Sequence, residues 1–256
     1  MPLSSSSSSS STGCCSNNND IEDSKNSSLS SSAKSIGFNA KELESIPESS
    51  IWGVGCGGNP IKFAHIKEGD TVVDFGSGAE GIDVFLAANI VKEQAKVSGI
   101  DMTDDMLQKA RDNAKKHGYI NAEFRQGDIE NKVPVENNSI DIVTSNNNCV
   151  INLTANKTNA FKEVYRILKP KVGMMVLSDL VTYKEFNVDS IEVESWCRCI
   201  DGVLTKDNYI KSMKEAGFKN VEIIDEISYL EVEPPEQNQE DNGRKITSLT
   251  IMAIKD

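Results

Sequence analysis

Two groups of residues in this chain have the types and spacing that chemistry requires. The first is a glycine-rich loop, residues 74–81 (Asp-Phe-Gly-Ser-Gly-Ala-Glu-Gly), which follows a short β-branched run. The second is a set of six cysteines, at positions 14, 15, 56, 149, 197 and 199. Glycines let the backbone approach a ligand closely, and thiolates bind soft centres. The two groups therefore indicate a nucleotide-like ligand and a soft ion.

The glycines of the loop match the dinucleotide fingerprint G-x-G-x-x-G. Asp101 follows the next predicted strand, where it can accept both hydroxyls of a ribose. Asp74 precedes the first glycine; it opposes a diphosphate but suits a cationic amino-acid tail. Asp128 follows the third strand and can accept from an adenine amino group. The pattern favours S-adenosylmethionine (SAM) as the ligand over a nicotinamide dinucleotide. The alternative is that Asp101 and Asp128 are only turn residues that follow strands. The predicted cofactor-binding residues are Asp74, Gly76, Ser77, Gly78, Asp101, Met102, Asp128 and Ile129.

Strands and helices alternate along the part of the chain that must position these residues. This alternation is typical of βαβ units and a parallel sheet. The last two strands follow each other without a helix, which predicts an antiparallel hairpin at the sheet edge. The predicted strands are 71–75, 96–100, 122–125, 140–144, 174–177, 221–229 and 247–254, and the predicted helices are 82–91, 103–118, 156–168 and 206–216.

Composition excludes several classes of partner. The 256 residues carry 27 Lys and Arg against 39 Asp and Glu, a net charge of −12, which argues against a nucleic-acid or anionic-membrane partner. Apolar runs are far shorter than the ~20 residues that cross a bilayer, and no secretory signal is evident. We expect a cytoplasmic protein. Residues 1–35 are rich in Ser and Asn and are predicted to be disordered; residues 36–256 form the predicted domain.

Several motifs carry a resemblance to known proteins. The segments 74–78, 100–103, 127–130 and 168–170 occur in an order that resembles class I SAM-dependent methyltransferases. The segments 55–60 (Gly-Cys-Gly-Gly-Asn-Pro), 83–88 (Asp-Val-Phe-Leu-Ala-Ala), 149–153 (Cys-Val-Ile-Asn-Leu) and 199–204 (Cys-Ile-Asp-Gly-Val-Leu) resemble the arsenite methyltransferase family more specifically. The resemblance implies a Rossmann-like α/β fold, with a seven-stranded, mostly parallel sheet and helices on both faces.

The resemblance also implies a substrate and its ligands. Cys56, Cys149 and Cys199 match the arsenic-handling cysteines of the family, so they are the predicted catalytic and arsenic-binding residues. Cys149 and Cys199 would hold trivalent arsenic during transfer, and Cys56 would support the first methylation. Residues 180–205 would form a substrate cover. The expected partners are thiol-bound arsenite and a thiol reductant such as glutathione or thioredoxin, and we expect a monomer.

Departures from the family pattern leave alternatives open. Additional residues occur near Gly58, Glu80 and Asn147, and they could displace a catalytic sulfur. One alternative is therefore a weakened relative that binds metalloid or SAM without turnover. Another is a SAM-dependent methyltransferase acting on a lipid or a quinone, which would share every cofactor motif. A structural zinc is a third, although the Cys197-x-Cys199 spacing is shorter than zinc sites prefer.

Overall fold

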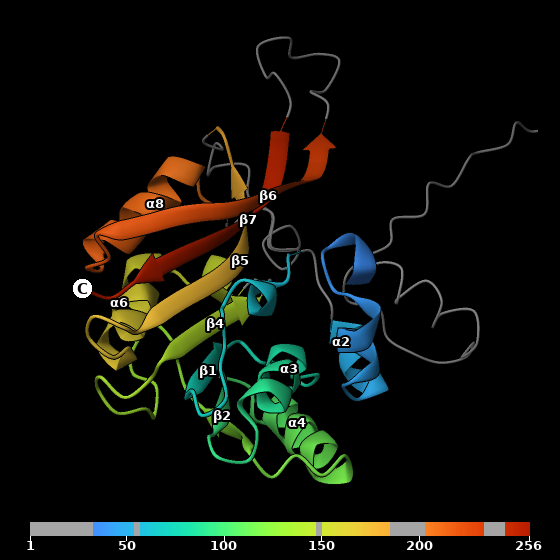
Figure 1. Cartoon of the computed structure of the whole chain (residues 1–256). Coiled ribbons are helices and arrows are strands. Elements are labelled where there is room, and N and C mark those ends of the chain that lie inside the picture. Colours follow the sequence, from blue (N-terminus) through green and yellow to red (C-terminus); the bar gives the residue numbers. More distant parts are fainter. Residues whose placement is uncertain (1–32, 54–56, 147–149, 185–202, 233–243) are drawn as a thin grey trace, which may run out of the picture.

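A computed structural model describes residues 33–53, 57–146, 150–184, 203–232 and 244–256 of the chain. Seven strands form one sheet in the order β3-β2-β1-β4-β5-β7-β6 (Figure 1). The first five strands run parallel, and β7 pairs antiparallel with both β5 and β6. The predicted fold class, including the antiparallel edge hairpin, is confirmed.

The strands and helices lie where the sequence pattern predicts them. The strands are β1 (Val72–Phe75), β2 (Val97–Asp101), β3 (Ala122–Gln126), β4 (Ile142–Asn146), β5 (Met174–Thr182), β6 (Asn220–Val232) and β7 (Arg244–Ile254). The main helices are α3 (Ile82–Val91), α4 (Asp104–Lys116), α6 (Lys157–Ile167) and α8 (Lys206–Glu215). Shorter elements, absent from the prediction, are α2 (Ala40–Glu44), η1 (Glu48–Gly53), η2 (Pro60–Lys62) and α5 (Val150–Leu153).

One strand is longer than predicted. The pattern predicted a strand over 174–177, whereas β5 continues to Thr182 with every residue from Met175 onward buried. The prediction stopped at Ser178 because polar side chains there break the apolar run. In the structure, strand β7 covers β5 along its whole length, so Ser178 and Asp179 are buried and hydrogen-bonded rather than exposed.

Apolar side chains pack on both faces of the sheet, because alternate residues of a strand point to opposite sides. On one face, Val73 and Phe75 pack with α6 and α8; on the other, Val72 packs with α3 and α4 (Figure 1). Asp74 therefore shares the face of Val72 and points toward the α3 side. No described helix is long and apolar enough to span a membrane.

Candidate functional site

The glycine loop turns sharply at the carboxyl end of β1 and leads into α3. Gly76 and Gly78 have φ values of 80° and 60°, which side chains rarely adopt. The backbone N–H groups of Gly76 and Ser77 donate to the Ile100 carbonyl at 2.8 and 3.2 Å, which ties the loop to the end of β2. The Ser77 hydroxyl is buried and has no hydrogen-bond partner among the described residues. The Ser77 side chain lies over Gly99 of β2, where a Cβ would be 2.6 Å from its hydroxyl, so this glycine lets the loop lie close to the sheet.

Asp101 lies against this loop, at the end of β2. Its carboxylate accepts from the backbone N–H of Gly78 at 3.1 Å and from that of Thr103 at 2.9 Å. The second contact is a local turn bond, but the first joins the glycine loop after β1 to the end of β2. The next side chain, Met102, is 70% exposed. This arrangement leaves an acidic acceptor beside an open apolar surface, as a ribose and an adjoining base require.

Two carboxylates are fully buried behind the loop. Asp74 accepts from the Thr144 hydroxyl at 2.9 Å, and Asp83, in the first turn of α3, accepts from the Asn146 amide at 3.5 Å. Burial raises the pKa of Asp74 well above its usual range, and the charge of Asp83 raises it further. Burial raises the pKa of Asp83 to about 7, with Glu42 adding to the effect. Among the described residues, neither carboxylate forms an ion pair with a lysine or arginine.

The Asp83 carboxyl makes folding stability depend on pH. Because its pKa is about 7 in the folded protein, well above the ordinary aspartate value of 3.8, the folded state retains a proton that the unfolded chain loses. The contribution of the Asp83 carboxyl to folding stability is greatest below about pH 4 and falls as the pH rises toward 7. Asp83→Asn cannot ionise, so we expect the variant to gain roughly 2–4 kcal/mol over the wild type between pH 4 and 8. Chemical unfolding of both proteins in the absence of ligand measures this difference.

Glu68→Gln is the matched control for this measurement. Glu68 is exposed in the segment before β1, so the variant removes one acidic charge without changing a buried group. The acidic side chains that act on Asp83 or are acted on by it are Asp74 and Glu42. A difference between Asp83→Asn and wild type that stays constant from pH 4 to 8 would contradict the expected result.

Asp128 occupies the corresponding position after β3. Its carboxylate accepts from the Glu130 backbone N–H at 2.9 Å and from the Asn131 amide at 2.5 Å, so local turn bonds orient it. Ile129 beside it is buried. The side chain of Glu130 accepts from the backbone N–H groups of Ala155 and Asn156, which ties this loop to the start of α6. The strand order β3-β2-β1 thus puts the three predicted acids at the ends of neighbouring strands.

A second buried polar cluster, which the sequence did not predict, lies beneath the ends of β4 and β5. The Asp179 carboxylate accepts from the Asn152 amide at 2.7 Å and from the Tyr209 hydroxyl at 2.8 Å. Burial raises the pKa of Asp179 to about 6. Lys157 donates to the Asn152 and Thr154 carbonyls. The cluster joins α5, β5, α6 and α8. Its one signal in the sequence was an acidic residue, Asp179, inside the apolar run that forms β5.

All six cysteines, including the predicted arsenic ligands Cys56, Cys149 and Cys199, lie outside the described residues. Most of the predicted substrate cover and nearly all of the predicted tail also lie outside them. Within the described residues, no group of three or more His, Cys, Asp or Glu could hold a metal ion. The cysteine predictions therefore stay predictions.

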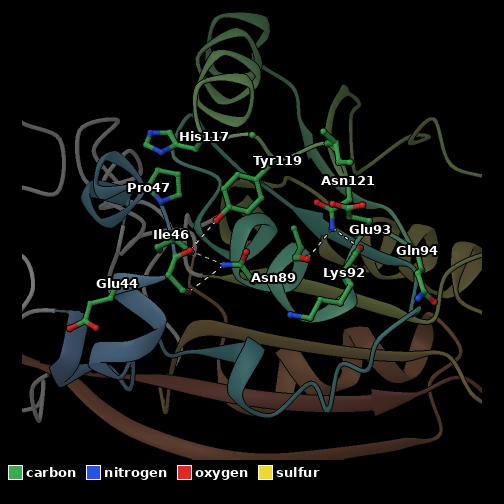
Figure 2. A pocket seen from close by; sticks show the side chains of 14 residues that line it. Glu44, Ile46, Pro47, Asn89, Lys92, Glu93, Gln94, His117, Tyr119 and Asn121 are labelled. Carbon is green, nitrogen blue, oxygen red and sulfur yellow. Dashed lines mark hydrogen bonds between the residues drawn. The ribbon is translucent and has the colours of Figure 1, made fainter.

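Figure 2 shows a pocket of about 780 Å³. It is lined by residues at and after the carboxyl ends of α2, α3 and α4, whereas the glycine loop precedes α3 and Asp101 precedes α4. The Tyr119 hydroxyl and the Asn89 amide both donate to the Ser45 carbonyl, so these polar groups are already paired. None of the predicted site residues lines this pocket.

Comparison with known proteins agrees with this geometry. A family model described as a methyltransferase domain matches residues 66–217, which include the glycine loop, all three strand-end acids and the Asp179 cluster. The chain belongs to the methyltransferase-domain family. Within this family, the structure is similar to a crystal structure of an arsenic(III) S-adenosylmethionine methyltransferase from Chlamydomonas reinhardtii. The TM-score is 0.66 and the identity is 26%, and the match covers 88% of this chain and 73% of that one.

Curated methyltransferases give the same result at the level of sequence. The chain is 38% identical over 226 residues to arsenite methyltransferase from Halobacterium salinarum, covering 88% of this chain and 56% of that protein. It is 34% identical over 174 residues to arsenite methyltransferase from Homo sapiens, covering 64% and 44%. The chain thus spans about half the length of the curated relatives it matches. The predicted likeness to arsenite methyltransferases is confirmed.

Proposed function

We propose that this protein transfers a methyl group from SAM to trivalent arsenic held by the thiolates of Cys56, Cys149 and Cys199. The observation that carries the proposal concerns the described residues next to these cysteines. Two described residues near Cys56 and Cys149 in the chain, Gly58 and Asn146, meet at Ser178, where the end of β4 pairs with the middle of β5. The likeness to arsenite methyltransferases supports the same substrate.

The residues around the glycine loop fit SAM. Asp74 and Asp83 are buried acids without a basic partner among the described residues, and SAM carries an ammonium and a sulfonium. A cation close to them would favour their ionised forms and offset their burial. Asp101 would hold the ribose hydroxyls, Met102 would pack on the adenine, and Asp128 with Ile129 would border it. Ser77, whose hydroxyl has no partner, together with Gly76 and Gly78 would line the amino-acid end.

Chain length limits how far two of the cysteines can lie from each other. Asn146 pairs with Ser178 across β4 and β5, and a Cβ added at Gly58 would lie 3.0 Å from the Ser178 hydroxyl. Cys149 is three residues beyond Asn146, and Cys56 is two residues before Gly58. Because extended residues span at most about 3.6 Å each, Cys149 and Cys56 lie within about 11 and 7 Å of these two neighbouring anchors. A ligand shared by both sulfurs is therefore within reach of the chain.

The segment that carries Cys199 is anchored at the same end of the sheet. Thr182, the last residue of β5, forms a bridge with Thr205, and its backbone N–H donates to the Leu204 carbonyl at 3.0 Å. Both ends of the 185–202 segment therefore leave from one place, next to the end of β5. The Asp179 cluster fixes this place to α5, which begins one residue after Cys149.

Three thiolates suit trivalent arsenic because both partners are soft. When bound, SAM would supply a methyl group on a positively charged sulfur. The lone pair of arsenic(III) would form the new bond to the methyl carbon as the carbon–sulfur bond breaks, leaving S-adenosylhomocysteine and pentavalent arsenic, which two thiolates would reduce again by joining in a disulfide. The protein itself would need no general base; its residues hold arsenic near the methyl group and exclude water. We further propose that a cytoplasmic thiol reductant, such as glutathione or thioredoxin, delivers arsenic and reduces any disulfide formed, and that the protein acts as a monomer.

The direct test is a product assay with arsenite, SAM and glutathione. We expect methylated arsenicals with one S-adenosylhomocysteine for each methyl group transferred, and no S-adenosylhomocysteine when arsenite is omitted. A quinone or lipid acceptor replaces arsenite in a parallel reaction and should give no turnover. Turnover of such an acceptor without arsenic would support a small-molecule methyltransferase instead. Arsenite and SAM binding without product would indicate a relative that has lost turnover.

A further inference from the structure

Gly58 lies where no larger residue fits. A Cβ at this position would lie 2.9 Å from the Thr250 hydroxyl and 3.0 Å from the Ser178 hydroxyl. These two residues face each other across β5 and β7, and their hydroxyls share a hydrogen bond of 2.9 Å. Both side chains are 2% exposed or less. Because the two hydroxyls satisfy each other inside the sheet, neither can turn away from an added methyl group without leaving a polar atom unpaired.

The residues after Gly58 are also held in place. Asn59 is buried, its side-chain oxygen accepts from the Lys62 backbone N–H at 3.2 Å, and its amide donates to Glu42 at 3.1 Å. Pro60 then begins η2. With Asn59 fixed on one side, a methyl group on Gly58 requires a shift of a few tenths of an ångström, either of the paired hydroxyls beneath it or of the chain that precedes it. That chain leads, two residues earlier, to Cys56.

We propose that Gly58 is a positioning residue: because it has no side chain, the backbone at Gly58 lies directly on the paired hydroxyls of Ser178 and Thr250, at the point from which the chain leads back to Cys56. The proposal rests on the proposed function of Cys56 in the first methylation. It gives a physical role to the pair Gly57-Gly58, one of which is the additional glycine by which this chain departs from the arsenite methyltransferase pattern.

The test compares Gly58→Ala with a triple variant, Gly58→Ala/Ser178→Ala/Thr250→Ala, in the full chain. Trimming both hydroxyls removes the two close contacts and leaves neither partner unpaired, so it should make room for the new methyl group. We expect Gly58→Ala to reduce both arsenite affinity and the first methylation about tenfold, since displacements of ~1 Å can cost a hundredfold. Affinity for SAM should stay within twofold, and the triple variant should recover to within about twofold of its control, Ser178→Ala/Thr250→Ala.

Further readouts separate positioning from general damage. Methylarsonous acid already carries the first methyl group, so Gly58→Ala should methylate it almost as fast as the wild type does. Thermal unfolding shows whether the variant is folded. Wild-type arsenite affinity and first methylation in Gly58→Ala would overturn the proposal, as would a loss that trimming fails to reverse. If Cys56→Ser leaves the first methylation unchanged, the proposed function of Cys56 fails and the proposal falls with it. If Cys56→Ser reduces it and Gly58→Ala does not, only the positioning role fails.

Discussion

Replacing Cys149 with serine should lower the formation of methylated arsenicals by at least about a hundredfold. A hydroxyl is a hard and weakly acidic ligand, so serine cannot replace a thiolate on a soft centre, and arsenic held by the remaining thiolates would lose its alignment. The assay uses arsenite, SAM and glutathione and measures arsenical products. Affinity for SAM, measured by calorimetry, should stay within about twofold, because the cofactor residues are on other segments.

Cys197→Ser is the matched control. Cys197 has no counterpart in the family pattern, so the same chemical change should leave methylation within about twofold of the wild type. Undiminished activity in Cys149→Ser would remove Cys149 from the mechanism. Equal losses in the two variants would mean that the serine substitutions disturb the protein in general and do not remove a specific ligand.

Replacing Asp101 with alanine should raise the dissociation constant for SAM by about 30- to 100-fold. A hydrogen bond to a charged group contributes about 1.5–3 kcal/mol, and the Asp101 carboxylate would accept from two ribose hydroxyls. It also holds the Gly78 N–H at 3.1 Å, so its loss frees the loop that lines the amino-acid end. Calorimetric titration with SAM or S-adenosylhomocysteine measures the effect without requiring turnover.

Asp104→Ala supplies the control for charge. Asp104 is three residues further along, its side chain is 73% exposed, and its ion pair with Arg111 is 3.5 Å long. The Asp104→Ala variant loses the same unit of charge as Asp101→Ala. Because exposed ion pairs contribute little to stability, its affinity for SAM should change less than twofold. If Asp101→Ala also stays within about threefold of the wild type, Asp101 is a turn residue only and the ribose contact is wrong.

Much of the scaffold was predictable because its signals are local. The β-branched run before the glycines, the acidic first turn and basic last turn of α4, and the apolar stripe of α6 each depend on neighbours within a few residues. These signals predicted the parallel strands, the helices between them and the edge hairpin. They did not predict α5, since a four-residue helix has too few turns to show a period. They also ended β5 early, at Ser178, because the burial of its polar residues depends on β7.

The chain alone determined which side chains stand at the ends of the strands: Asp74, Asp101 and Asp128 follow directly from local pattern. Only the tertiary structure decided what those side chains meet. Thr144 reaches Asp74 because β4 lies beside β1, although 70 residues separate them. Likewise Asn152 binds Asp179, and Gly58 lies on Ser178 and Thr250. Such contacts depend on strand order and layer packing, which bring distant segments together and which no local pattern encodes.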